Sequence, residues 1–269
     1  MLIWVCALHC EAKPVIDFYR LKKSHDDNAF DVYRGDGMVC IISGTGKIAS
    51  AAACAWIAAQ NAREPALAWI NLGVAGAAED DIGKLFALDK IVDADSGQRY
   101  YPAPVVSSPL PARACLTLSE ARQDYRDDCL FDMEASGFIY SALRFSSAEL
   151  TRSLKVISDN RRHQTGRKRQ QVSDLIQGNI EAIDIEATAL LDLESEISAL
   201  EFSAESWRQL LGMAHFTQTQ KNRLRVLWRY LSNRDFSPEA LLERLAQQKN
   251  AAGMIATLEQ ISYRDAEEL

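Results

Sequence analysis

The first 160 residues alternate between continuous apolar runs and segments whose apolar positions recur at helical spacing. Buried strands are predicted at 2–8, 66–73, 89–96, 114–119 and 153–160, and helices at 47–62 and 133–145. Residues 30–44 are divided by Gly35, Asp36 and Gly37, a sequence that is typical of the turn of a β-hairpin. Continuous apolar strands separated by helices predict an α/β fold with a largely buried sheet.

The pattern changes near residue 161, and no strand-like run follows. Apolar residues recur at helical spacing from 172 to the end, and Ser237 followed by Pro238 predicts the cap and first position of a helix. We therefore expect an α/β domain over 1–171 and a C-terminal helical extension over 172–269. The first helix of this extension is equally compatible with the α/β domain.

Composition and charge narrow the class of protein. The chain has 269 residues, of which 48% are hydrophobic and 25% charged, a balance typical of globular domains. Its net charge of −7 argues against nucleic-acid binding. No apolar run approaches the roughly 20 residues that span a bilayer, and the first residues lack the basic region of a signal peptide. We therefore expect a cytoplasmic protein that has no transmembrane segment and binds no nucleic acid.

The cysteines and histidines do not form a recognisable metal-binding pattern. None of the six cysteines belongs to a CxxC pair, and most lie inside apolar runs, as buried thiols do in a reducing compartment. The four histidines lack the spacing of zinc ligands. We expect neither a metal nor an organic cofactor.

Polar residues gather where the predicted strands end, which is where ligands bind in open α/β sheets. Glu11 follows the first strand, Glu134 lies at the junction between an apolar run and a helix, and Asp159 lies near the end of the last strand. Glycine-rich turns are expected at 43–47 and 71–76. Singly, these features also fit tight turns and helix starts. Together they predict three acids around one crevice.

Several of these pieces occur in the order found in a known superfamily. They are "ALHCEAKPV", "SGTGKIASAAA", "INLGVAGAAEDDIGKLFALDKIV", "FDMEAS" and "VISDN". From residue 1 to about 160 the chain resembles the purine nucleoside phosphorylase and 5′-methylthioadenosine/S-adenosylhomocysteine nucleosidase superfamily, and the nucleosidase branch most of all. The resemblance implies a three-layer nucleoside-phosphorylase-like α/β fold with a mixed central sheet, and a homodimer.

The resemblance also implies roles for individual residues. Asp159 would give a proton to purine N7, and Glu11 would be the general base that aligns the attacking water. Met133 would pack against the ribose, and Glu134 would accept hydrogen bonds from its hydroxyls. Asp132 is expected to face away from the ligand and to cap the following helix. Further positions that match the substrate site of the family are Leu8, Thr45, Gly76 and Phe131.

The predicted function is hydrolytic cleavage of the N-glycosidic bond of a purine nucleoside or adenosyl compound. Asn71 stands where the phosphorylase pattern would place an arginine, whereas Val74 replaces a hydroxyl residue common in nucleosidases. Three alternatives stay open: phosphorolysis, cleavage of an adenosyl group attached to a hopanoid lipid, and a catalytically inactive nucleoside-binding protein whose helical tail engages a partner. The basic segment 161–169 fits a solvated loop or an anion-binding lid.

Overall fold

The computed structural model describes residues 1–25, 29–61, 66–103, 108–121, 128–163, 166, 168–199, 204–232 and 236–267. The chain forms two compact units, Met1–Ser195 and Glu196–Leu269. The first unit therefore extends beyond residue 171 and includes the first part of the helical region expected from the sequence.

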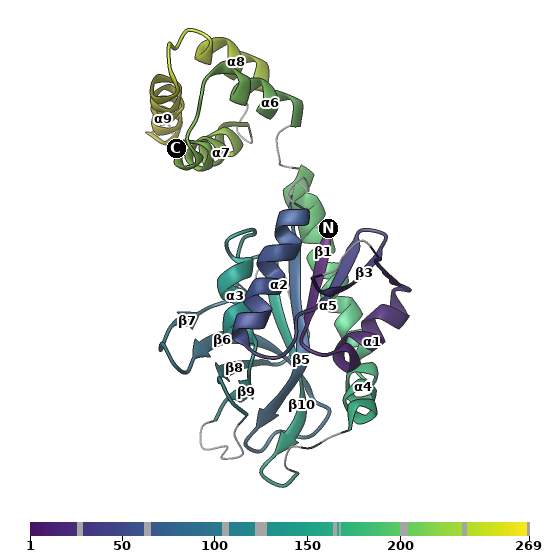
Figure 1. Ribbon diagram of the computed structural model, residues 1–269. Helices are drawn as coiled ribbons and strands as arrows, with labels where there is room; N and C mark the ends of the chain where they lie inside the picture. The colour runs from purple at the N-terminus through teal and green to yellow at the C-terminus, as the bar shows by residue number, and fades with distance from the viewer. Residues whose placement is uncertain are drawn as a thin grey trace. The chain divides into compact units, whose positions relative to one another are not determined.

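The first unit is built on a mixed β-sheet (Figure 1). Its strands are β1 (Leu2–Cys6), β2 (Lys22–Lys23), β3 (Asp31–Gly35), β4 (Met38–Ile42), β5 (Ala68–Ala77), β6 (Leu85–Asp93), β7 (Arg99–Tyr100), β8 (Ala112–Thr117), β9 (Leu130–Asp132) and β10 (Thr151–Asn160). The strand order is β10-β6-β8-β9-β5-β1-β4-β3-β2, and β10 also pairs with β5. Five strands, β5, β10, β6, β8 and β9, thus pair in a closed ring, which β1 and β4 extend on one side.

Helices cover both faces of this sheet and give the three layers that the sequence predicted (Figure 1). The helices of the unit are α1 (His9–Phe18), α2 (Lys47–Gln60), α3 (Ala135–Ala142), α4 (Arg169–Gln177) and all but the last residues of α5 (Ile180–Ala199). Helices α2 and α3 pack together against one face, and α1 and α4 pack together against the other.

Strands β5 and β10 lie at the centre of the unit and are longer than predicted. They run parallel over almost their whole length, and all ten residues of β10 are buried. Strand β1 is parallel to β5, and β4 to β1, so the carboxyl ends of β1, β4, β5 and β10 reach the same edge of the sheet. The predicted hairpin is present as β3 and β4.

Helices α2 and α3 approach each other closely at Gly137. A Cβ atom added there would lie 1.9 Å from the backbone oxygen of Lys47, which is the first residue of α2. No real contact is this short, and the obstacle is backbone that cannot rotate away. Glycine at position 137 therefore sets the distance between the two helices.

The second unit consists of helices around an apolar core. They are α6 (Ala204–Met213), α7 (Gln218–Ser232), α8 (Pro238–Leu245) and α9 (Ala251–Glu267). The Ser237 hydroxyl accepts a hydrogen bond from the backbone of Ala240 at 3.1 Å, so the predicted cap is confirmed. Trp228 is fully buried among leucines of this core, as expected for a packing residue.

Most of the cysteines are buried thiols, as expected from their positions in apolar runs. All six cysteines are free thiols, and five of them are buried. None of the described helices combines the length and the apolar character that crossing a bilayer requires.

We predict that Gly137→Ala lowers the free energy of unfolding of the first unit by about 2–4 kcal/mol, because α2 and α3 must move apart. Amide hydrogen exchange in β5 and β10 measures this unit by itself. The control is Gly178→Ala, where the nearest atom to the added Cβ would lie at 3.4 Å and the backbone is helical. We expect a change within about 1 kcal/mol there. Equal effects of both substitutions would contradict the steric explanation.

Candidate active site

A cavity of about 210 Å³ opens at the carboxyl ends of β1, β5 and β10. Its lining includes all eight residues that the sequence analysis selected: Leu8, Glu11, Thr45, Gly76, Phe131, Met133, Glu134 and Asp159. The structure thus brings together residues from segments that are far apart in the chain. Gly76 and Phe131 are neighbours because β5 pairs with β9 at these two residues.

Glu11 is fixed by the backbone on either side of its carboxylate. One oxygen accepts a hydrogen bond from Leu8 N at 2.9 Å, and the other accepts one from Val74 N at 3.0 Å. The residue is only 4% exposed, and burial raises the pKa of its carboxyl. A Cβ atom at Gly73 would lie 2.9 Å from Glu11 Oε1, so glycine leaves the room that this carboxylate occupies.

Glu134 joins the start of α3 to the turn before α2. Its Oε1 accepts a hydrogen bond from Gly46 N at 2.8 Å. Gly46 has φ +97°, a backbone conformation that L side chains rarely adopt, so this turn depends on glycine. Burial raises the pKa of Glu134 to about 7, against the lowering effect of a nearby lysine. The carboxyl can therefore gain or lose its proton near neutral pH.

Asp159 lies where the pairing of β10 with β5 is irregular. The register shifts between Ile157 and Asp159, so β10 carries one extra residue, Ser158, opposite β5. Such bulges re-aim the side chains that follow them. Both Ser158 and Asp159 line the cavity, and the serine hydroxyl donates to the carboxylate at 2.5 Å.

A buried lysine lies among these acids. Lys155 Nζ is 2.9 Å from Asp132 Oδ2, and the side chains of both residues are almost completely buried. Burial by itself would lower the pKa of Lys155, but Asp132, Glu134 and Glu11 together raise it. The ammonium group therefore stays charged and partly neutralises three carboxylates.

Asp132 does cap α3 as expected, since its Oδ2 accepts hydrogen bonds from the backbone of Glu134 at 3.2 Å and Ala135 at 2.7 Å. Asp132 is among the residues around the cavity, but its side chain has no exposed surface and pairs with Lys155 instead. Burial alone would raise the pKa of Asp132, but Lys155 and the hydrogen-bond donors keep that pKa below its ordinary value.

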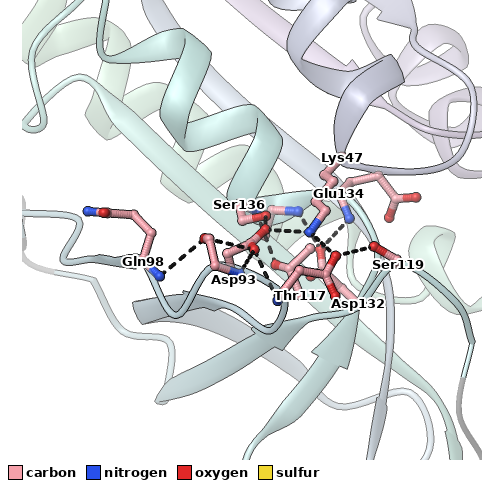
Figure 2. A network of polar contacts seen from close by, with 11 residues as sticks. Lys47, Asp93, Gln98, Thr117, Ser119, Asp132, Glu134 and Ser136 are labelled. Atoms are coloured by element: carbon pink, nitrogen blue, oxygen red, sulfur yellow. Dashed lines mark hydrogen bonds and ion pairs between the residues drawn. The ribbon is translucent and has the colours of Figure 1, made fainter.

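Figure 2 shows how the acids are tied to a wider polar network. The Thr117 hydroxyl donates to Asp132 at 2.7 Å and accepts from Ser136 N at 3.0 Å. The Ser136 hydroxyl donates to Asp93 at 2.8 Å, and Lys47 Nζ contacts the same Asp93 oxygen at 2.7 Å. This network thereby holds in one arrangement the ends of β6, β8 and β9 and the starts of α2 and α3.

Lys155 and Thr117 are not among the residues that the sequence predicted for this site. A signal for the lysine exists, because a single cation inside the apolar run "SLKVISDN" must be paired if the strand is buried. Thr117 carries no comparable signal. Within the described part of the chain, no three His, Cys, Asp or Glu side chains are grouped so that they could hold a metal ion.

No protein-family model matches the chain, and no curated protein matches its sequence. Solved structures do match. A 5′-methylthioadenosine nucleosidase from Arabidopsis thaliana is 18% identical with a TM-score of 0.53, and the match covers 68% of this chain and 94% of that one. A Helicobacter pylori 5′-methylthioadenosine/S-adenosylhomocysteine nucleosidase bound to butyl-thio-DADMe-Immucillin-A is 10% identical with a TM-score of 0.57. This match covers 71% of this chain and 97% of that one.

The futalosine hydrolase of Helicobacter pylori strain 26695 is also similar, with 12% identity and a TM-score of 0.54 over 71% of this chain and 97% of that one. These likenesses show that the chain has the nucleosidase/phosphorylase fold, as the sequence predicted.

We predict that Lys155→Met lowers the free energy of unfolding by about 3–5 kcal/mol, because it leaves buried carboxylates without their cation. Hydrogen exchange in β5 and β10 again provides the measurement. The matched control is Lys155→Met combined with Asp132→Asn, which removes both charges. Its loss should be clearly smaller than the sum of the two single losses. Strict additivity, or a stable Lys155→Met protein, would show that the pair contributes little.

We also predict that Glu134 makes stability depend on pH. Its pKa is raised from the ordinary 4.5 to about 7 on folding. The folded state thus holds this proton more tightly than the unfolded chain does. Protonated Glu134 therefore contributes up to about 3 kcal/mol to the free energy of unfolding. This contribution is fully present below about pH 4.5 and is lost as the pH rises through about 7.

Glu134→Gln should remove this part of the pH dependence, so the variant should gain stability relative to the original protein between pH 5 and pH 8. Unfolding free energies of both proteins across this range provide the test. Glu181→Gln, at an exposed position of α5, is the control and should follow the original protein. Parallel curves for Glu134→Gln and the original protein would refute the assignment.

Proposed function

We propose that the chain hydrolyses the N-glycosidic bond of a purine nucleoside or adenosyl compound. The observation that carries this proposal is the meeting of three buried carboxyl groups, Glu11, Glu134 and Asp159, around one cavity at the carboxyl ends of the strands. Each comes from a different segment of the chain, and the sequence resemblance implies a role for each of them.

In the proposed reaction, Asp159 donates a proton to N7 of the purine. The bond between C1′ and N9 then breaks, and its electron pair leaves with the purine. A water oxygen bonds to C1′, and Glu11 accepts the proton that this water releases. The two backbone hydrogen bonds to Glu11 leave further lone pairs on its oxygens, so the carboxylate can still accept this proton.

Glu134 and Met133 are proposed to hold the ribose. A charged Glu134 would accept hydrogen bonds from the ribose hydroxyls, and such bonds are stronger than those between neutral groups. Bound hydroxyls favour the charged form, so ligand binding should lower the pKa of Glu134. Lys155 acts here as a positioning residue, because it neutralises the acids without lining the cavity.

Hydrolysis is favoured over phosphorolysis by the cavity lining, in which none of the described residues is an arginine or a lysine. Asn71 lies inside β5 and donates to the Val5 carbonyl at 3.1 Å, so it does not replace a phosphate-binding arginine. The structural neighbours named as nucleosidases and as a hydrolase support the same choice.

We predict that incubation with adenosine, 5′-methylthioadenosine or S-adenosylhomocysteine releases free adenine and free sugar, with or without phosphate. Chromatography of the products provides the measurement. Asp159→Asn should lower turnover by about 10²–10⁴-fold and still bind nucleoside, since an amide keeps the shape but cannot give the proton. The control is Asp89→Asn, at an exposed position of β6 away from the cavity.

Each contrary result points to a different alternative. A sugar 1-phosphate as the main product would indicate phosphorolysis. Tight nucleoside binding without cleavage of any compound would indicate a nucleoside-binding protein. Normal turnover by Asp159→Asn would remove this residue from the mechanism.

A further inference from the structure

Leu8 lines both the first cavity and a second one, of about 300 Å³. The second cavity lies between α1 and α4, which pack against each other. Its lining is Leu8, His9, Cys10, Lys13, Arg169, Gln170 and Ser173. The two cavities therefore meet at Leu8, and the proposed reaction does not use the second one.

The two cavities differ in charge. The residues around the cavity at Glu11 include four acidic ones and, among those described, no lysine or arginine. The second cavity has the opposite character, since Lys13 and Arg169 line it and none of its described lining residues is acidic. Arg169 is also the first residue of α4, whose first turn has no acid, so the positive end of the helix dipole adds to the same region.

We propose that this second cavity is a subsite for an anionic group, a phosphate or carboxylate, carried on the 5′ carbon of the substrate. The inference rests on the proposed function. With the base at Asp159, the ribose hydroxyls at Glu134 and the water at Glu11, the remaining substituent of the ribose is its 5′ carbon. Leu8, which is 41% exposed, is the apolar boundary that this substituent would cross.

The sizes of the cavities support a substrate longer than a nucleoside. Small-molecule sites usually enclose about 300–1,000 Å³. The cavity at Glu11 encloses about 210 Å³, below this range, whereas the second cavity contributes about 300 Å³ more. A ligand that occupies both would fill a site of ordinary size.

The two cations are not equivalent. Lys13 already pairs with Asp17, one helical turn further along α1, so an incoming anion would compete with that carboxylate. Arg169 offers a planar guanidinium that can hold phosphate or carboxylate through two hydrogen bonds. We therefore assign the larger share of recognition to Arg169.

The test compares adenosine 5′-monophosphate with adenosine as substrates. We expect the original protein to show the higher kcat/KM for the monophosphate. Arg169→Gln should lower the ratio of the two constants by about 10–100-fold, the loss expected for a hydrogen bond to a charged group, and Lys13→Gln should lower it less. The ratio should also fall at high salt, because exposed cations are screened. The control is Arg161→Gln, which removes an exposed arginine of the same basic segment that pairs with Glu79 and does not line the cavity.

The outcomes separate this inference from the proposed function. Cleavage of adenosine with no preference for the monophosphate, or an unchanged ratio in Arg169→Gln, refutes the subsite and leaves the nucleosidase intact. If the protein cleaves neither compound, calorimetry decides. The anion subsite is supported if the monophosphate binds more tightly than adenosine and Arg169→Gln weakens that binding. Equal binding of both compounds, or binding of neither, refutes it.

Free phosphate provides the last comparison. Inorganic phosphate that competes with the monophosphate and gives no sugar phosphate supports the subsite. Formation of a sugar 1-phosphate would make phosphate the nucleophile and would overturn the assignment of the anion to the 5′ substituent.

Discussion

The buried ion pair between Asp132 and Lys155 is the interaction on which the candidate site depends. Removing two charges from water is favourable only when their remaining hydrogen-bonding capacity is also satisfied. Here the lysine comes from β10, and the aspartate also accepts hydrogen bonds from Thr117 in β8 and from the first residues of α3. The charges can therefore be buried only when these segments are assembled together, so correct assembly of the fold and formation of the site are the same event.

The ion pair also determines the protonation of the neighbouring acids. One ammonium group faces three carboxylates, and Asp132, the closest, takes most of its stabilisation and stays charged. At Glu134 and Glu11 the effect of burial outweighs that of the lysine, so the pKa of Glu134 rises to about 7 and the pKa of Glu11 is raised as well. Burial beside a single shared positive charge therefore gives one carboxyl, Glu134, a pKa near neutral pH.

Helix α1 connects this acidic site to a basic one. Glu11 points into the acidic cavity, whereas Lys13, two residues later, lines the cavity next to α4. Leu8 separates a region suited to protons and hydroxyls from one suited to an anion. Glu134 is brought to the acidic cavity by the turn at Gly46 and by the close approach of α2 and α3 at Gly137.

The sequence by itself determined the local structure and the types of reactive residue. The first and last predicted strands, the Ala-rich helix and the cap at Ser237 depend on neighbouring residues. The structure has them as Leu2–Cys6, Thr151–Asn160, Lys47–Gln60 and the cap of α8. The order of Glu11, Glu134 and Asp159 was sufficient to predict that they meet. Tertiary structure alone decided that β5, β10, β6, β8 and β9 close into a ring, that the Asp132 side chain is buried, and that Lys155 is its partner. These depend on contacts between distant segments, and a strand's own residues do not specify which strand it pairs with or which charge lies opposite.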